Sequence, residues 1–161
     1  MTRYQIREAE DRDAEPVTRI FNYYVQHSFG AYPEEPVPVT FFAFLREGAH
    51  AFPVIEHEVG VIGFGILKPF FPFSTFKDTG SVTYFIAPEY TRSGLGTLLL
   101  NTLIDAARER GLHILVASIS SRNPQSLNFH KKHGFRECGR LEGVGMKFGE
   151  RFDVVWMQRD V

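Results

Sequence analysis

The feature of the sequence that most constrains the fold is a strand, a glycine-containing turn and a helix in direct succession. Residues 82–86 are β-branched and aromatic, which favours a strand. Pro88 should end that strand, because proline has no N–H to donate to a sheet ladder. Apolar residues then recur every three or four positions over residues 95–106, which predicts an amphipathic helix that stops at Gly111. A helix that directly follows a strand packs on the sheet, so we expect an α/β fold.

The turn between this strand and helix is short and polar, and it contains two glycines. The first N–H groups of a helix have no partner within it, and the helix dipole makes that point attractive to an anion. Glycine also lets a phosphate approach the backbone closely. Alternatively, the glycines merely allow the helix to pack tightly on the sheet. The phosphate-binding hypothesis involves Arg92, Ser93, Gly94, Leu95, Gly96 and Thr97.

The rest of the chain supplies the other elements of such a fold. Asp11 or Asp13 can cap the first helix, and Asn123 followed by Pro124 is typical of the start of the last one. Further strands are predicted at residues 4–7, 52–56, 61–67, 113–119, 135–141 and 151–158, and further helices at residues 14–24, 39–46 and 124–133.

The predicted order is β-α-α-β-β-β-α-β-α-β-β, with helices and strands arranged around a mixed sheet. A crossover helix joins the strand at residues 82–86 to the strand at residues 113–119, so these two should pair in parallel. At 161 residues the chain has the size of one domain with a genuine core. We therefore expect a single domain that spans residues 1–161.

Composition and charge argue against several classes of function. The formal net charge is −1, which provides no electrostatic footprint for nucleic acid or for an anionic membrane. The most apolar window, residues 64–76, is interrupted by a lysine and two prolines and does not fit a membrane span of ~20 residues. Residues 1–15 are charged, which predicts no signal peptide, and a single cysteine suits a reducing compartment. A cytoplasmic protein is expected.

The cysteine and most of the histidines show no pattern that indicates chemistry. The histidines other than His130 have no metal-ligand spacing, so solitary surface or core histidines are the better interpretation and no metal is expected. Cys138 falls in a predicted strand, where a buried and inert thiol is a better interpretation than a nucleophile.

The strand, turn and helix resemble the acetyl-CoA motif of the GNAT superfamily of N-acetyltransferases, in which a Gln/Arg-x-x-Gly-x-Gly/Ala turn joins the two elements. Gly94 and Gly96 match, whereas Thr91 stands at the Gln/Arg position and Arg92 beside it can partly compensate. The resemblance implies the GNAT fold, a mixed and mostly antiparallel sheet that splays at its centre and has flanking helices. In that fold the gap between the central strands admits the pantetheine arm of acetyl-CoA.

Three other segments resemble the phosphinothricin N-acetyltransferase-like family, so the resemblance extends over nearly the whole chain. They are residues 20–25, residues 123–135 and residues 145–154. Members of that family acetylate the amino group of small amino-acid-like molecules and are usually homodimers. The resemblance therefore implies an acetyl-CoA-dependent N-acetyltransferase in which a small-molecule amine attacks the thioester directly, and it implies a homodimer.

Two departures from that family concern the acceptor. The family has a glutamate, the proposed general base, at the start of the central strand, and counting back from Pro88 puts Ser81 at that position. Ser81 cannot deprotonate an ammonium unaided, although it could hold a water. Basic residues that grip the acceptor's acidic group in the family correspond to Phe71 and Phe73 in the preceding loop. A neutral or aromatic amine is therefore as plausible an acceptor as an amino acid.

The resemblance also assigns roles along the central strand. It places the pyrophosphate of the cofactor on residues 92–97 and the pantetheine arm on the backbone of Tyr84, Phe85 and Ile86. The N–H of Ile86 would donate to the oxyanion of the tetrahedral intermediate. The alternative for these three residues is a plain central strand, and their side chains do not distinguish the two.

The predicted last helix carries three further candidates. Asn123, Ser126 and His130 lie three and four residues apart and therefore on one helix face. By resemblance, Asn123 and Ser126 would contact the cofactor, and His130 would protonate the leaving thiolate as a general acid. The alternatives are an ordinary N-cap at Asn123 and a surface imidazole at His130.

Two other functions remain open. A GNAT-fold module that binds CoA without turnover would explain serine at the position of the family's glutamate. A nucleotide-binding α/β protein could use the same glycine turn for other phosphates. That turn lacks the lysine of a P-loop and the third glycine of a dinucleotide-binding fingerprint, so the second alternative is the weaker one.

Overall fold

The computed structural model describes residues 3–161, and the strands within them form one seven-stranded sheet in the order β1-β2-β3-β4-β5-β7-β6. The order of strands and helices along the chain is the one predicted. The strands are β1 Gln5–Glu8, β2 Pro53–His57, β3 Gly60–Pro69, β4 Thr79–Ile86, β5 Ile114–Ser120, β6 Arg136–Lys147 and β7 Glu150–Asp160. The helices are α1 Ala14–His27, α2 Phe41–Arg46, α3 Leu95–Glu109 and α4 Pro124–Lys132, and the 3-10 turns are η1 Asp11–Asp13, η2 Ser74–Phe76 and η3 Pro88–Tyr90.

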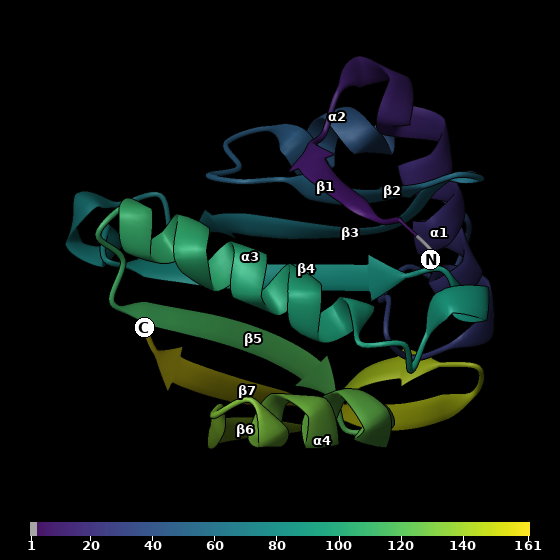
Figure 1. Cartoon of the computed structure of the whole chain (residues 1–161). Coiled ribbons are helices and arrows are strands. Elements are labelled where there is room, and N and C mark those ends of the chain that lie inside the picture. Colours follow the sequence, from purple (N-terminus) through teal and green to yellow (C-terminus); the bar gives the residue numbers. More distant parts are fainter. Residues whose placement is uncertain (1–2) are drawn as a thin grey trace.

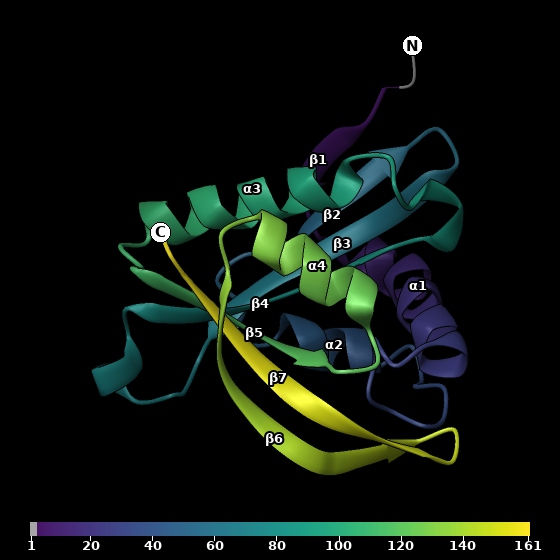
Figure 2. The same cartoon turned by 90° about the horizontal axis from the view of Figure 1, so that it is seen from below.

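The helices cover both faces of the sheet (Figures 1 and 2). α3 crosses one face, where Leu103 and Ala107 of its apolar stripe are buried with Leu115 of β5. α1 and α2 lie against the opposite face, where Phe21 packs in a separate cluster with Phe64 of β3. The sheet is therefore the middle layer between two apolar cores, and burial of both cores holds its position.

The two central strands separate along their length (Figure 1). β4 and β5 pair in parallel over only three residue pairs, and the last of these joins Ser81 to Val116. β4 nevertheless stays paired with β3 as far as Ile86, and β5 stays paired with β7 as far as Ser120. The other neighbouring strands of the described sheet are antiparallel. The sheet is mixed, mostly antiparallel and splayed at its centre, which confirms the prediction.

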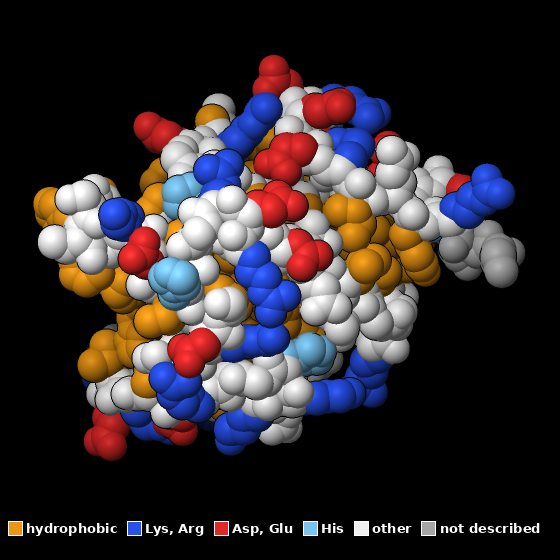
Figure 3. Space-filling model, turned by 60° about the vertical axis from the view of Figure 1, so that its left-hand side comes forward, with side chains coloured by type: hydrophobic (Ala, Val, Ile, Leu, Met, Phe, Trp, Pro, Cys, Tyr) orange, Lys and Arg blue, Asp and Glu red, His pale blue; other side chains and the backbone are white. Residues whose placement is uncertain are grey.

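Charges of both signs are interspersed on the surface. Acidic and basic side chains alternate over the face in Figure 3, in keeping with the formal net charge of −1. Within residues 3–161, no helix has both the length and the apolar character needed to cross a bilayer.

Two local predictions were wrong. Cys138 is exposed rather than buried, because β6 is an edge strand of the sheet; its Sγ donates to the carbonyl of Trp156 at 3.3 Å. The side chains of Asp11 and Asp13 do not cap α1. These residues form η1 instead, and Asp13 turns back to accept the N–H of Glu10 at 2.7 Å.

This Asp13 carboxylate ties the start of α1 to the edge of the sheet. Asp13 is only 2% exposed, and its carboxylate accepts hydrogen bonds from the Arg7 guanidinium at 2.7 and 2.9 Å. Arg7 also donates to Glu56 of β2 at 2.8 Å. Burial alone would raise the pKa of Asp13, but the hydrogen bonds from Arg7 and from the Glu10 N–H outweigh it and lower the pKa below 3.8.

We predict that Asp13→Ala lowers the free energy of unfolding by about 3 kcal/mol, because the mostly buried Arg7 guanidinium loses one of its two carboxylate partners and keeps only Glu56. Urea denaturation measures the change. Asp11→Ala is the matched control, since the Asp11 carboxylate is fully exposed where it pairs with Arg46 and should contribute little. Equal destabilisation by the two substitutions would contradict the assignment.

Candidate functional site

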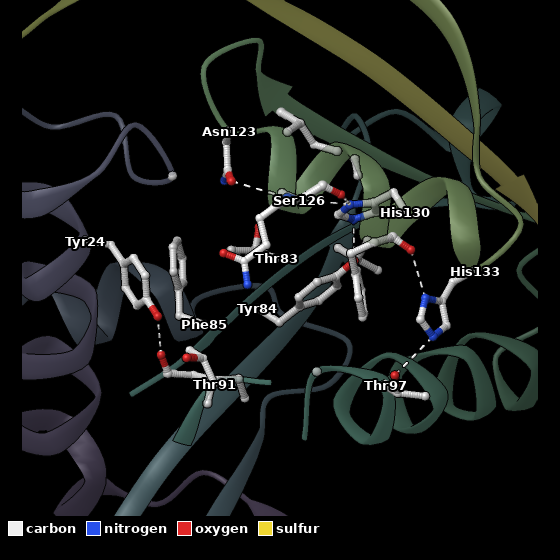
Figure 4. A pocket seen from close by; sticks show the side chains of 18 of the residues that line it. Tyr24, Thr83, Tyr84, Phe85, Thr91, Thr97, Asn123, Ser126, His130 and His133 are labelled. Carbon is white, nitrogen blue, oxygen red and sulfur yellow. Dashed lines mark hydrogen bonds between the residues drawn. The ribbon is translucent and has the colours of Figure 1, made fainter. Parts of the chain in front are cut away.

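A cleft of about 510 Å³ opens where β4 and β5 separate. Its walls are the second half of β4, the turn before α3, the end of β5 and the start and inner face of α4. Tyr24 of α1 reaches the same cleft from the other face of the sheet (Figure 4). The cleft therefore passes between the two strands, so molecules held on opposite faces of the sheet could meet there.

One edge of β4 presents its backbone groups to this cleft. The N–H of Ala87 and the C=O of Thr79 bond toward β3, at 2.8 and 3.2 Å. Backbone groups alternate between the two edges of a strand, so those of Tyr84 and Ile86 face the gap. The hydroxyl of Tyr24 donates to the C=O of Ile86. The N–H groups of Tyr84 and Ile86 lie beyond the β4–β5 register and are oriented to meet a ligand in the gap.

The turn before α3 leaves three N–H groups without a helical partner. The first hydrogen bond of the helix runs from the N–H of Leu98 to the C=O of Gly94 at 3.1 Å, so the N–H groups of residues 95–97 have none within the helix. Gly94 has a φ of 85° and Arg92 a φ of 59°, so the chain enters the left-handed region twice in this turn. Together with the helix dipole and the Arg92 side chain, these groups can attract an anion to this end of the cleft. Anion binding at this turn, residues 92–97, stays a prediction, and the turn is called the anion-binding turn below.

Asn123 fixes the start of α4, as predicted. Its Oδ1 accepts the N–H of Ser126 at 3.2 Å, and Pro124 occupies the first turn of the helix. Ser126 and His130 follow on one face, four residues apart, and both line the cleft. Asn123 lines it as well, so capping the helix and facing the cleft are compatible roles for this residue.

His130 is buried, with 3% of its surface exposed. Its Nδ1 lies 2.7 Å from the carbonyl oxygen of Ser126, which can only accept, so Nδ1 carries the proton. The hydroxyl of Tyr84 meets the other nitrogen, Nε2 (Figure 4). Burial lowers the pKa of His130, although its hydrogen bond to the Ser126 carbonyl acts in the opposite direction. Burial also raises the pKa of Tyr84. The two side chains therefore form a neutral pair, and His130 is not a surface imidazole.

A second histidine joins α4 to the start of α3. His133 Nδ1 donates to the carbonyl of Phe129 at 2.8 Å, and its Nε2 lies 3.0 Å from the Thr97 hydroxyl (Figure 4). Both ring nitrogens are thus engaged. This contact fixes the spacing between the anion-binding turn and the helix that carries His130.

Lys147 of β6 holds the loop that borders the cleft on the α1 side. Lys147 is 2% exposed, and its Nζ donates to the carbonyls of Ser28 at 2.7 Å and Ala31 at 2.6 Å. Burial lowers the pKa of Lys147. Gly30, between the two carbonyls, lines the cleft. The β6–β7 hairpin is therefore attached directly to one wall of the site.

The structure brings most of the predicted site residues together. Ser93 and Leu95 belong to the turn before α3 and the start of that helix but do not line the cleft. The predicted residues that do line it are Tyr84, Phe85, Ile86, Arg92, Gly94, Gly96, Thr97, Asn123, Ser126 and His130.

Three further predicted residues lie outside both the cleft lining and the turn before α3. Ser81 sits in the closed part of the β4–β5 pair, opposite Val116. Phe71 and Phe73 lie in the loop around η2 and are 49% and 67% exposed. Their proposed roles in catalysis and acceptor binding stay predictions.

Sequence reasoning missed two hydroxyl groups, those of Tyr24 and Tyr84. In the sequence, Tyr24 stands out only as part of the predicted helix at residues 14–24, and Tyr84 only through the backbone of the central strand. The available signal was that tyrosine combines an apolar body with a polar tip that needs a partner when buried. Among residues 3–161, no group of three or more His, Cys, Asp or Glu side chains is arranged to hold a metal.

A sequence profile described as "Acetyltransferase (GNAT) family" matches residues 13–135, which is more than half of the chain. The chain belongs to the GNAT family of acetyltransferases. The L-methionine sulfoximine/L-methionine sulfone acetyltransferase of Pseudomonas paraeruginosa is 32% identical over 95% of this chain and 92% of its own length. The phosphinothricin N-acetyltransferase of Alcaligenes faecalis is 30% identical over 96% of this chain and 81% of its own.

Solved structures of GNAT proteins share the architecture. The GNAT superfamily phosphinothricin acetyltransferase from Sinorhizobium meliloti, in complex with acetyl-CoA, superposes with a TM-score of 0.90 at 25% identity. The alignment covers 98% of this chain and 88% of that one. These comparisons confirm the GNAT fold and the resemblance to the phosphinothricin N-acetyltransferase-like family.

We predict that Gly96→Val weakens acetyl-CoA binding at least tenfold, or about 1.4 kcal/mol, with little loss of stability. A Cβ at Gly96 would lie 3.4 Å from the Phe129 ring, an ordinary contact, but would stand at the anion-binding turn. Isothermal titration calorimetry measures the affinity. Gly139→Val is the control, because Gly139 lies in β6 with open space around it. Undiminished affinity in a folded Gly96→Val protein would overturn the placement.

We predict that His130 titrates below its ordinary pKa of 6.5, because burial disfavours the imidazolium. Between that lowered pKa and 6.5 the unfolded chain binds more protons than the folded one, so the free energy of unfolding falls as the pH falls through this window. NMR titration of the ring measures the midpoint, with the signal assigned by its loss in His130→Gln. A midpoint at or above 6.5 would refute the burial argument.

Proposed function

We propose that the protein is an acetyl-CoA-dependent N-acetyltransferase in which a small-molecule amine attacks the thioester directly. The observation that carries the proposal is the gap between β4 and β5, which has strand N–H groups on one side and a helix N-terminus at its end. Family membership supports it, and so do the named relatives, which are acetyltransferases of small amino-acid-like molecules. A binding module without turnover has no comparable support.

The proposed cofactor position follows from the two kinds of donor in the cleft. The pyrophosphate would lie at residues 92–97, where unpaired N–H groups and Arg92 meet. The pantetheine arm would run along the backbone edge of Tyr84 and Ile86, between β4 and the α4 face that carries Asn123 and Ser126. The backbone of Phe85 faces β3, so Phe85 would contribute its side chain instead.

The thioester carbonyl would then lie near the end of β4. Its oxygen gains negative charge when the amine attacks, and the N–H of Ile86, aimed into the gap, is the proposed donor to that oxyanion. An N–H held by a strand needs no reorganisation at the moment of reaction. Ser81, which lies outside the cleft lining, could hold a water only at a distance from this point.

The acceptor would enter from the α1 side. The cleft residues there, Tyr24, Gly30, Thr83 and Phe85, carry no formal charge at neutral pH, whereas Arg92 and Lys132 line the end near the start of α3 and the end of α4. A carboxylate held among the first four would lack a charged partner, so we propose a neutral or aromatic amine. The names of the relatives favour an amino-acid-like acceptor as the second candidate.

The whole chain is proposed to act as one domain, in a cytoplasmic homodimer. The single cysteine is consistent with a reducing compartment. Apolar side chains exposed on the β6–β7 hairpin offer a surface for a second copy, and they are Leu141, Val144, Met146 and Phe148. The proposed partners are acetyl-CoA and a small amine, without nucleic acid or a membrane.

Turnover of acetyl-CoA with a panel of amines tests the proposal. Release of free CoA thiol is measured with arylalkylamines, amino acids and phosphinothricin, with the heated enzyme as the background control. Acetyl-CoA binding without turnover of any amine would favour a non-catalytic module.

We predict that kcat/KM is higher for arylalkylamines without an acidic group than for phosphinothricin, because the described residues on the acceptor side of the cleft offer apolar rings and no cation. Steady-state kinetics at saturating acetyl-CoA measures the ratio. Phe71→Lys and Phe73→Lys serve as probes of the loop around η2, and a gain in phosphinothricin turnover would support a role for those positions. A preference for phosphinothricin in the unaltered protein would overturn the prediction.

A further inference from the structure

We propose that the Tyr84 hydroxyl and His130 form a proton shuttle that takes a proton from the attacking amine and returns it to the sulfur of CoA. The inference rests on the proposed N-acetyltransferase function. It makes Tyr84 a catalytic residue, because its hydroxyl would meet the reacting atoms, and it makes His130 the group that stores the proton behind it.

The direction of the hydrogen bonds carries the argument. Because Nδ1 of His130 donates to the Ser126 carbonyl, the neutral ring has an acceptor at Nε2. The Tyr84 hydroxyl therefore donates to Nε2. The lone pairs of the Tyr84 oxygen remain to accept a proton from the cleft, which both side chains line. The arrangement is poised to move a proton from the cleft to His130.

Most other titratable side chains in the cleft lining are already occupied, wrongly charged or placed away from the proposed thioester. Tyr90 also lines the cleft, but unlike Tyr84 its hydroxyl is not hydrogen-bonded to a base among the described residues. Within the described residues, no aspartate or glutamate lines the cleft. His133 is held in the same way, by the Phe129 carbonyl and the Thr97 hydroxyl, but Thr97 lies in the turn where the pyrophosphate, not the thioester, is proposed to bind. Tyr24 donates to the C=O of Ile86. Arg92 and Lys132 are cations at neutral pH and cannot accept a proton there. The pair of Tyr84 and His130 combines a hydroxyl that faces the cleft with a hydrogen-bonded ring nitrogen that can take its proton.

The proposed steps balance in atoms and charge. The amine nitrogen forms its bond to the thioester carbon, and the carbonyl oxygen becomes an oxyanion while the nitrogen becomes positive. A proton passes from that nitrogen to the Tyr84 oxygen as the Tyr84 proton passes to His130 Nε2, which gives an imidazolium held by the Ser126 carbonyl. The C–S bond then breaks as the oxyanion collapses, and the same path returns one proton to the thiolate.

This path explains how the chain could act without a glutamate at Ser81. A shuttle needs a group that is neutral at rest, so that it can accept a proton, and that gives the proton back readily. Burial lowers the pKa of His130 and serves both needs. His133 is the other titratable group that acts on it, and its charge would lower that pKa further.

A double-mutant cycle tests the shuttle, with amines as acceptors and rates compared at equal concentrations of free amine. Tyr84→Phe keeps the ring, which stacks on His130 and meets Phe129 edge to face. It should lower kcat about 10²-fold or more and leave the KM for acetyl-CoA nearly unchanged. His130→Phe should do the same, and the double variant should lose little more than either alone, because the two act as a unit. Multiplicative losses would refute a shared path.

The pH profile separates a shuttle from a merely structural contact. The wild-type rate should fall as the pH drops through the His130 titration seen by NMR, since the imidazolium cannot accept a proton. This fall in rate at low pH, the acid limb of the profile, should be missing from the residual activity of Tyr84→Phe. Tyr23→Phe is the control for loss of a tyrosine hydroxyl, because Tyr23 lies on α1 outside the cleft lining and should keep full activity. A pH limb that persists in Tyr84→Phe would reduce Tyr84 to a structural role.

Failure of the shuttle can be told apart from failure of the proposed function. An unaltered enzyme that turns over amines, together with a Tyr84→Phe enzyme of nearly equal kcat, would refute the shuttle alone. An unaltered protein that binds acetyl-CoA and acetylates no amine would refute the proposed function, and the shuttle with it.

Discussion

The cleft depends on one departure from regular pairing, the loss of the β4–β5 ladder after three residue pairs. A strand in the middle of a sheet normally forms backbone hydrogen bonds with both neighbouring strands. Here β3 and β7 hold the outer edges of the two strands, so the inner edges can part without either strand losing its place. The groups released on β4 are rigidly aimed, because the strand that carries them stays hydrogen-bonded along its other edge.

The parted strands also decide which side chains can act on a bound thioester. Tyr84 projects from β4 toward α4, where His130 is fixed by its own helix and by the buried position of its ring. Phe85 projects to the other face and packs with Phe21 and Tyr24. In the proposed function, successive residues of one strand would serve the cofactor side and the acceptor side. The alternation of a β-strand would then separate the chemistry from the recognition of the amine.

Local patterns in the sequence were sufficient to predict the order of the strands and helices and the ends of the two helices that border the cleft, α3 and α4. Asn123 with Pro124, and the glycines at 94 and 111, act through backbone geometry within a few residues, so their roles could be read directly. The contact between Tyr84 and His130 spans 46 residues and depends on how α4 packs over β4, which no local pattern encodes.

The positions of loop and edge residues were equally hard to infer. The exposure of Cys138 follows from the place of β6 at the end of the sheet, and strand order is a global property. An alignment can put Phe71 and Phe73 at the positions of acceptor-binding residues, but it does not say where the loop around η2 projects. In the folded chain these rings are largely exposed.

The anchoring of the 28–31 loop by Lys147 has a consequence for how the protein is made. The loop follows α1, near the beginning of the chain, whereas the amine that fixes it lies near the end of β6. A chain emerging from the ribosome exposes its N-terminal segments first. The wall of the cleft on the α1 side can therefore take its final form only after residue 147 has been synthesised. A nascent chain stalled before that point would carry the turn before α3 without this finished wall.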